Sequence, residues 1–437
     1  MFHARKVRTA VAAAALLVSA AVALAGCSAA GDEAEATPTF DPDEKVTLDL
    51  AFWGNDVRAG LYNEAIAAFN EEYPNITVNV SFLGFPEFWE KRQTEAAGGG
   101  LPDVMQFDYT YLRQYSENGL LLDLDPYLGN IIDTDPIQST LDIGVVDDKT
   151  TALTIGTNAW ALFSNPSLLD AIGVDDFPGG SWGDYSDWMA DYTEAAAAAG
   201  EQKWGGNDYT IRIQNFEVQQ RAKGEDLFTE DGQPNFDEED LAAFWEQGAD
   251  ARANADVIPQ KRITELMPLG GFDSANIASE LSWDNFGAGY VGNLGEGAKV
   301  VLNAPPVEAD GAKDLYLKPA MLHAISAETE HPEAAATLVN FLINSPEVGG
   351  IFGTNRGLPA SETQLEGAEL DDLAQQLLDY EESIGDRIGD APPVPIVGYG
   401  TLEQTFRQLG EELGFGTITV EDATSQFFSE MDVILNQ

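Results

Sequence analysis

Aromatic side chains stand next to acids and amides at places where the chain is expected to leave a strand. Trp53 is followed by Asn55 and Asp56, and Asp108 is followed directly by Tyr109. A sugar ring presents an apolar C–H face and a rim of hydroxyl groups. A flat aromatic side chain covers the face, while Asp or Asn hydrogen-bonds to the rim. These neighbours therefore indicate a site for a polyhydroxylated ring.

A similar group lies in the second half of the chain, where Trp283 is followed by Asp284 and Asn285. Two more tryptophans are candidates for ligand contact. Trp160 lies at an expected crossing between two lobes, and Trp204 precedes a pair of glycines. Core packing is the alternative for each of them, because large apolar rings are usually buried.

Signatures of catalysis or metal binding are missing from the sequence. The three histidines, His3, His323 and His331, do not have metal-ligand spacing. Residues 287–292 match the G-x-G-x-x-G pattern of dinucleotide-binding loops, but we interpret them as a glycine-rich loop. Among 74 Asp and Glu, no carboxylate pair can be singled out for glycoside hydrolysis. We therefore expect no catalytic residues, no cofactor and no metal site, while the many carboxylates leave a structural cation open as an alternative.

The charge balance narrows the class of partner. The chain has 22 Lys and Arg against 74 Asp and Glu, a formal net charge of −52. Such a charge argues against nucleic acid and against electrostatic adhesion to anionic lipids. It predicts a solvated acidic surface and makes a strongly anionic ligand less favourable.

The N-terminus predicts export. Basic residues at positions 5–8 precede an apolar run at 10–25, which is the pattern of a signal peptide spanning 1–26. The only cysteine follows at once, and Leu24-Ala25-Gly26-Cys27 resembles the lipobox of bacterial lipoproteins. That resemblance implies a diacylglycerol on Cys27 and an anchor on the outer face of the cytoplasmic membrane. The alternative is an ordinary secreted protein. Residues 27–45 are predicted to form a flexible stalk, because they carry almost no apolar mass.

The remaining chain predicts an α/β fold in two lobes. Strand and helix patterns alternate at first, which favours a mainly parallel sheet. A helix-rich stretch follows, and 315–326 returns to a strand pattern. A ligand then lies between the lobes. The expected ranges are strands at 46–53, 76–84 and 103–108, helices at 56–73, 86–97, 181–200, 237–254 and 331–347, a first lobe at 46–159 plus about 303–347, and a second lobe at 160–302 plus about 348–437.

The order of several segments resembles the extracellular solute-binding lipoproteins of carbohydrate ABC importers, a family related in fold to maltose-binding protein. The segments are AAGGGLPDVMQFD at 96–108, ALFSNPSLLDAIG at 161–173, SWGDYSDW at 181–188, and a helix at 331–348 followed by NRGLPA at 355–360. The second segment has Phe163-Ser164 where an aromatic pair is commoner, and the third lacks the usual Pro and Thr.

The resemblance implies two lobes joined by a hinge, a sugar bound between them, and a membrane permease as partner. It also implies that Arg356 faces the cleft together with the strand-end residues above, and it makes Tyr399 a further candidate. We expect a monomer. A receptor of the same fold for a polyamine or a glycerophosphodiester, and an exported glycoside hydrolase, remain as alternatives.

Overall fold

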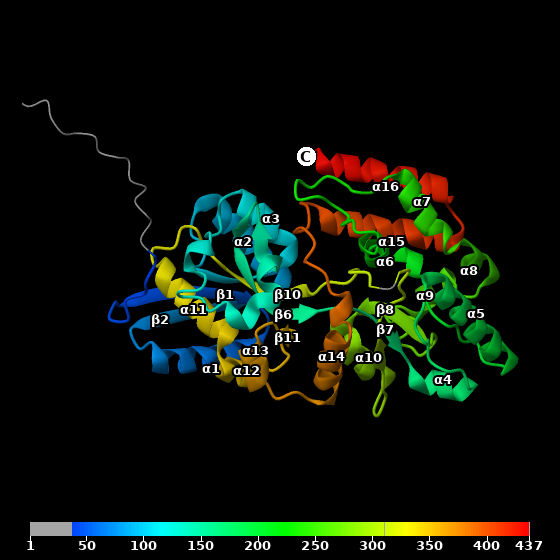
Figure 1. The fold of residues 1–437 in the computed structure, drawn as a ribbon, viewed down its shortest axis with the longest axis horizontal. Coiled ribbons are helices and arrows are strands. Elements are labelled where there is room, and N and C mark those ends of the chain that lie inside the picture. The colour runs from blue at the N-terminus through cyan, green and yellow to red at the C-terminus, as the bar shows by residue number, and fades with distance from the viewer. Residues whose placement is uncertain (1–36, 310, 437) are drawn as a thin grey trace, which may run out of the picture. The chain divides into compact units, whose positions relative to one another are not determined.

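The computed structural model describes residues 37–309 and 311–436 (Figure 1). The predicted signal peptide, Cys27 and residues 27–36 of the predicted stalk lie outside the described residues. Within residues 38–45 of that stalk, Phe40 packs edge-on against Tyr73 at 6.0 Å between ring centroids. Asn75 donates a hydrogen bond to the Pro42 carbonyl. This end of the predicted stalk is therefore attached to the folded body.

The larger sheet has six strands in the order β11-β6-β10-β3-β1-β2. The prediction of a mainly parallel sheet was wrong, because only β1 pairs in parallel, with β2 and β3, while β10 and β11 pair antiparallel. Helices return the chain between β1, β2 and β3, whereas β10 comes back from the second lobe and enters in the opposite direction. The strands are β1 (Val46–Trp53), β2 (Ile76–Leu83), β3 (Val104–Phe107), β6 (Ala152–Asn158), β10 (Lys318–Ile325) and β11 (Leu358–Pro359).

Helices cover both faces of this sheet, because β1 is apolar on both. Leu50 and Phe52 pack with α1, α11 and α12, whereas Ala51 and Trp53 pack with α2 and α3 on the other face. We call the sheet and its helices the six-stranded lobe (Figure 1). The helices are α1 (Asp56–Glu72), α2 (Phe85–Gly98), α3 (Tyr109–Glu117), α11 (Pro332–Asn344), α12 (Pro346–Phe352) and α13 (Glu362–Gly367), and a small hairpin of β4 (Val145–Val146) and β5 (Lys149–Thr150) lies beside them.

The second sheet has three antiparallel strands in the order β8-β7-β9. Its core is rich in aromatic side chains, including the fully buried Trp245 and Phe406. We call this sheet and its helices the three-stranded lobe. Its strands are β7 (Trp160–Ser164), β8 (Ser279–Trp283) and β9 (Val301–Asn303), and its helices are α4 (Pro166–Ile172), α5 (Trp182–Ala198), α6 (Ile213–Arg221), α7 (Glu238–Glu246), α8 (Ala249–Asn254), α9 (Gln260–Leu266), α10 (Gly287–Leu294), α15 (Tyr399–Phe415) and α16 (Val420–Leu435).

The chain crosses between the two sheets more than once, as expected. Only Ala159 separates β6 from β7, and residues 304–317 connect β9 to β10. Helix α14 (Asp372–Ser383) touches both β9 and β11. The predicted division of residues between lobes stays a prediction. Within it, β11 pairs with β6 and so belongs to the six-stranded sheet.

The strands and helices predicted from the sequence around the larger sheet are present in the structure. In the three-stranded lobe, two predicted elements were wrong. The helix expected at 237–254 begins where Asp237 caps it, yet it breaks at Gly248 into α7 and α8. Residues 287–292 form part of helix α10 rather than a loop, because Tyr290 packs its ring against Phe163 and Phe272. Among the described residues, no helix is long and apolar enough to cross a membrane.

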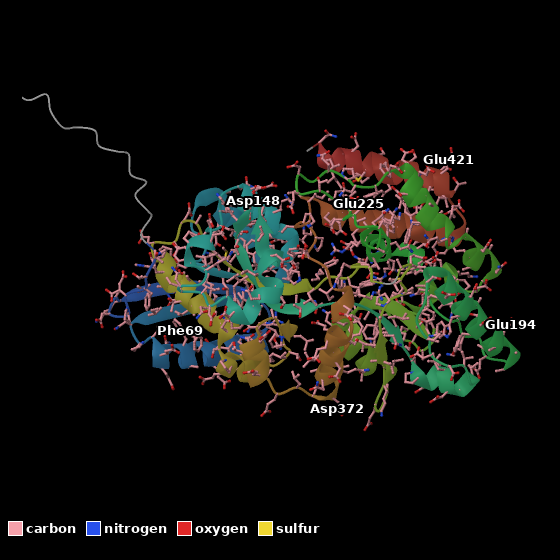
Figure 2. All side chains as sticks on the ribbon, viewed as in Figure 1. Phe69, Asp148, Glu194, Glu225, Asp372 and Glu421 are labelled. Carbon is pink, nitrogen blue, oxygen red and sulfur yellow. The ribbon has the colours of Figure 1, made fainter. Side chains whose placement is uncertain are left out.

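The surface is acidic, as the composition predicted. Figure 2 shows side chains projecting from the ribbon throughout, and five labelled acids are exposed. They come from both lobes and are Asp148, Glu194, Glu225, Asp372 and Glu421.

Candidate functional site

A cavity of about 260 Å³ that opens to solvent is lined by residues from both lobes. Its size suits a small ligand that extends towards the opening. Its walls come from the β3–α3 junction, from α6 and the loop after it, from the end of β8, from the start of β10 and from α15. The lining residues are Asp108, Tyr109, Thr110, Gln214, Glu217, Asp226, Leu227, Phe228, Trp283, Tyr316, Lys318, Pro392, Pro393, Pro395, Tyr399, Gly400 and Glu403.

Aromatic side chains supply much of the wall. The Trp283 ring stands edge-on to Tyr316, with centroids 6.0 Å apart, and Phe228 stands edge-on to Tyr399 at 6.2 Å. Trp160 supports Trp283 from behind, at 5.1 Å between centroids. Such rings give flat apolar surface with little rotamer freedom, which is what the C–H face of a sugar requires.

Acidic side chains supply most of the charge. Asp108, Glu217, Asp226 and Glu403 line the cavity, against one lining cation, Lys318. Glu217 is only 7 % exposed, and its carboxylate accepts a hydrogen bond of 3.0 Å from the Tyr316 hydroxyl. Burial raises the pKa of Glu217 to about 7, although Arg221 opposes the shift.

Lys318 lies over the cavity face of the aromatic wall. Its Nζ is 5.3 Å from the centroid of the Trp283 ring, within the range of a cation–π contact. Burial lowers the pKa of this ammonium group, while Asp108 and Glu403 act to raise it. The cavity thus combines acceptors, one strong donor and flat apolar surface.

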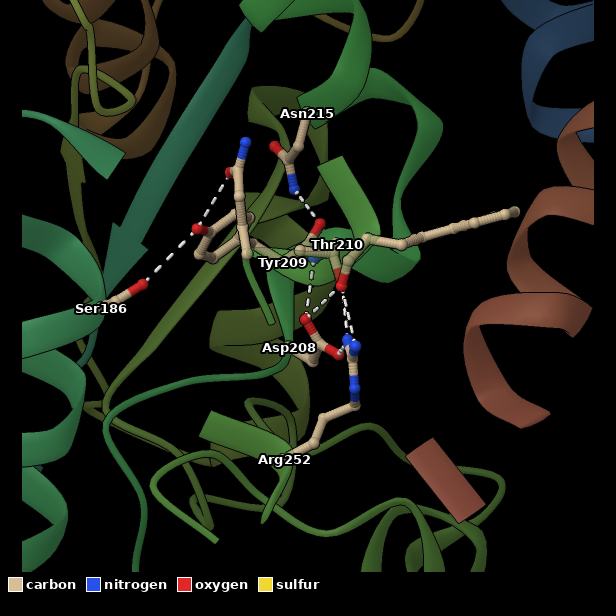
Figure 3. A network of polar contacts seen from close by, with 8 residues as sticks. Ser186, Asp208, Tyr209, Thr210, Asn215 and Arg252 are labelled. Atoms are coloured by element: carbon tan, nitrogen blue, oxygen red, sulfur yellow. Dashed lines mark hydrogen bonds and ion pairs between the residues drawn. The ribbon is translucent and has the colours of Figure 1, made fainter. Parts of the chain in front are cut away.

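A hydrogen-bond network behind the cavity holds the start of α6 (Figure 3). Asp208 accepts hydrogen bonds from the Thr210 amide and hydroxyl, and Arg252 donates to the same carboxylate at 2.7 Å. Asn215 donates to the Tyr209 carbonyl and accepts from the Trp160 indole at 2.8 Å. The network therefore fixes both α6, which carries Glu217, and the tryptophan that supports Trp283.

The six-stranded lobe contributes the β3–α3 junction. Asp108 caps α3 by accepting from the Thr110 amide, so its carboxylate is held at the mouth of the cavity. The Tyr109 hydroxyl donates to the Pro392 carbonyl at 3.3 Å, and Arg113 donates twice to the Val394 carbonyl. These bonds hold the proline-rich segment 392–395 against this lobe.

A second acid cluster lies at the crossing between β6 and β7. Asp284 accepts a hydrogen bond of 2.9 Å from the Ala159 amide, and Glu381 of α14 accepts one from the Thr157 hydroxyl at 3.0 Å. The two carboxyl groups lie close enough for the charge on Asp284 to raise the pKa of Glu381. Burial raises the pKa of Asp284 to about 7, and burial and the Asp284 charge raise that of Glu381 well above its ordinary value. The pair ties the crossing to both β8 and α14.

The structure brings four of the predicted site residues into the cavity: Asp108, Tyr109, Trp283 and Tyr399. Trp160 lies directly behind the wall, and Asp284 secures the crossing. Asn285 is exposed and is not part of the cavity lining. Whether these residues contact a ligand stays a prediction.

The remaining candidates lie away from this cavity. Trp53 packs among Phe88 and Trp89 in the core of the six-stranded lobe, and Asn55 caps α1. Trp204 is buried and bridges to Ile277. Asp56 is exposed in the first turn of α1. Arg356 is buried, and its guanidinium carbon lies 3.6 Å from the centroid of the Phe352 ring. Their role in ligand contact stays a prediction.

Sequence reasoning missed several lining residues. Tyr316 lies two residues before β10, and Lys318 is the first residue of that strand. Gln214 and Glu217 are three residues apart on α6 and share a helix face. The same spacings occur throughout the chain, so they indicate cavity residues only when the positions of the neighbouring helices and strands are known.

Comparisons with known proteins agree with this geometry. The family model described as bacterial extracellular solute-binding protein matches residues 54–348, more than half of the chain. The chain therefore belongs to this family. A curated binding protein of Brucella abortus is 26% identical over 159 residues, which is 36% of this chain and 36% of that protein, so the match spans about a third of that relative.

Two solved structures are similar over nearly the whole chain. An extracellular solute-binding protein of family 1 from Alicyclobacillus acidocaldarius is 26% identical, with a TM-score of 0.75, over 91% of this chain and 100% of that one. A periplasmic oligogalacturonide-binding protein from Yersinia enterocolitica is 22% identical, with a TM-score of 0.75, over 89% of this chain and 99% of that one. The two-lobed fold predicted from the sequence is confirmed.

Proposed function

We propose that this protein captures a carbohydrate in the cavity between its lobes and delivers it to the membrane permease of an ABC importer. The single observation that carries the proposal is the wall formed by Trp283, Tyr316 and Tyr399 beside Asp108 and Glu403. Flat rings and carboxylate acceptors are the two kinds of group that a sugar needs on its face and rim.

The comparisons support this choice of ligand class. One solved structure of the same fold is named for binding an oligogalacturonide, which is an oligosaccharide. The charge of the present cavity differs from what an oligogalacturonide requires, because four carboxylates line it. We therefore propose a carbohydrate without a high density of negative charge.

The proposal is one of binding without bond cleavage. Closure of the two lobes about the crossing at Ala159 would enclose the ligand and present both lobes to the permease together. We propose residues 46–159 with about 303–347 for one lobe and 160–302 with about 348–437 for the other, except that α12, β11 and α13 lie with the first. We propose that the protein works as a monomer.

A thermal-shift screen tests the ligand class. At a concentration 100 times its Kd, a bound sugar stabilises the protein by about 2.7 kcal/mol. We expect a rise in Tm with one or more oligosaccharides from a panel that varies ring type, linkage and length. A rise with polyamines and none with any sugar would overturn the proposal.

Polyamine binding is the second candidate, and the excess of acidic over basic lining residues favours it. A polyamine has no hydroxyl rim, however, and its methylene chain does not need several separated aromatic faces. Spermidine in the same screen separates the two candidates.

We also propose that the protein is exported and lipid-anchored through Cys27. The lipobox-like segment before the cysteine supports this. Replacing Cys27→Ser should release the protein from the membrane fraction while sugar affinity stays within about twofold, since the acyl chains act only as an anchor. Membrane retention of the variant after fractionation would contradict the anchor.

A further inference from the structure

The carboxylate of Glu217 is buried in the ligand cavity without a charged partner. Among the described residues, no Lys, Arg or His nitrogen lies within 4.0 Å of it. Its hydrogen bond comes from the neutral Tyr316 hydroxyl. Burying a carboxylate with one neutral donor is unfavourable, so a positive group brought by a ligand would be stabilised there.

The other three cavity acids are less buried than Glu217. Asp226 pairs with Arg221, while Glu403 accepts from the neutral Gln214 amide at 2.8 Å and Asp108 accepts from the Thr110 amide. Glu217 is thus the acid in this cavity that combines deep burial with the absence of an ion pair.

The aromatic wall around Glu217 already accommodates cations. The Arg221 guanidinium lies 5.1 Å from the Tyr316 centroid, and the Lys318 ammonium lies 5.3 Å from the Trp283 centroid. Tyr399 and Phe228 complete the wall, and no cation–π contact to either ring occurs among the described residues. Ring faces of this kind favour an ammonium group, particularly where water is excluded.

We propose that the saccharide bound in this cavity carries a primary ammonium group and that Glu217 is the residue that selects it. The inference rests on the proposed function and specifies its ligand as an amino sugar or an oligosaccharide that contains one. The ammonium group donates to the Glu217 carboxylate, while the sugar hydroxyls remain available to Asp108 and Glu403.

The protonation of Glu217 would then be coupled to binding. The charged and titratable groups that face it are Arg221 on its own helix, Tyr316 and Lys318 at the start of β10, Asp226 in the following loop, Tyr109 on α3, and Tyr399 and Glu403 on α15. Because ammonium binding favours the ionised carboxylate, binding of an amino sugar near pH 6 should release protons. An N-acetylated sugar has no charge to stabilise that form.

The experiment compares glucosamine oligosaccharides with their N-acetylated counterparts of equal length by titration calorimetry at pH 7. We expect the aminated sugar to bind at least about tenfold more tightly to the native protein. In Glu217→Gln, which resembles the protonated carboxyl in shape, the ratio should fall to about one. The matched control is Glu225→Gln, which removes the same charge from an exposed position and should leave the ratio unchanged.

The outcomes separate this inference from the proposed function. Binding of N-acetylated or neutral sugars without a preference for the amine overturns the inference and leaves carbohydrate binding standing. Binding of spermidine but no sugar supports an ammonium site and overturns the carbohydrate proposal. No binding of any aminated compound overturns the inference, and the comparison within the native protein decides this even where Glu217→Gln does not fold.

Discussion

Two buried arginines, one in each lobe, have different surroundings. In the three-stranded lobe, the Arg252 guanidinium lies 2.7 Å from Asp208 inside a hydrogen-bond network. In the six-stranded lobe, the buried Arg356 lies over the Phe352 ring, and its guanidinium nitrogens have no hydrogen-bond partner among the described residues. Most of the side chains that line the cavity come from the first of these lobes. The buried arginine with a charged partner therefore lies in the lobe that supplies most of the recognition surface.

The largest expected effect follows from breaking the paired site. Replacing Arg252→Met leaves the Asp208 carboxylate buried without its cation, so we expect a loss of about 3 kcal/mol in the free energy of unfolding. Chemical denaturation measures it. The matched control is Arg262→Met, whose partner Glu265 is exposed, and which should change stability by less than about 1 kcal/mol. Equal losses for the two variants would contradict the comparison.

The next effect concerns the acid pair between the lobes. The raised pKa values of Asp284 and Glu381 mean that the native state holds protons that the unfolded state releases above about pH 4. Stability should therefore fall as pH rises from 5 to 8, and Glu217 and Glu280 act in the same direction.

Replacing Glu381→Gln removes one of these groups and keeps a neutral partner for Asp284. We expect the Tm of this variant to fall less steeply with pH and to exceed that of the native protein at pH 8. Thermal unfolding at several pH values tests this. Parallel curves for variant and native protein would contradict the raised pKa values of this pair.

The smallest expected effect comes from the charge without a partner. Replacing Arg356→Met removes a desolvated cation and leaves no acid unpaired, so stability should change by less than about 1 kcal/mol or increase. Ligand affinity should also be unchanged, because Arg356 is outside the cavity lining. A fall in ligand affinity would contradict this prediction and would support the ligand contact by Arg356 that the family resemblance implies.

Sequence patterns predicted the parts of this molecule that local chemistry determines. Strand β1 and the Asp237 cap follow from alternation and capping, and Trp283 reaches the cavity because it ends a strand. Trp53 also ends a strand, yet α2 covers it with Phe88 and Trp89. Whether a strand-end aromatic meets a ligand or a neighbouring helix depends on packing between distant segments, which local patterns do not contain.

The cavity residues that the sequence did not predict also depend on packing between distant segments. Lys318 and Glu217 are ordinary charged residues in the sequence, and they become distinctive only when β10 and α6 meet at one cavity. The antiparallel entry of β10 into the six-stranded sheet likewise depends on a chain return across the second lobe.

The most direct test of the account compares one cavity residue from each lobe. The bound saccharide is titrated into the native protein, Trp283→Ala and Thr110→Ala. We predict a loss of affinity of about 100-fold for Trp283→Ala, as expected for a central aromatic contact, and of about threefold for Thr110→Ala. Unchanged saccharide affinity in a folded Trp283→Ala variant would contradict the assignment of this cavity as the binding site.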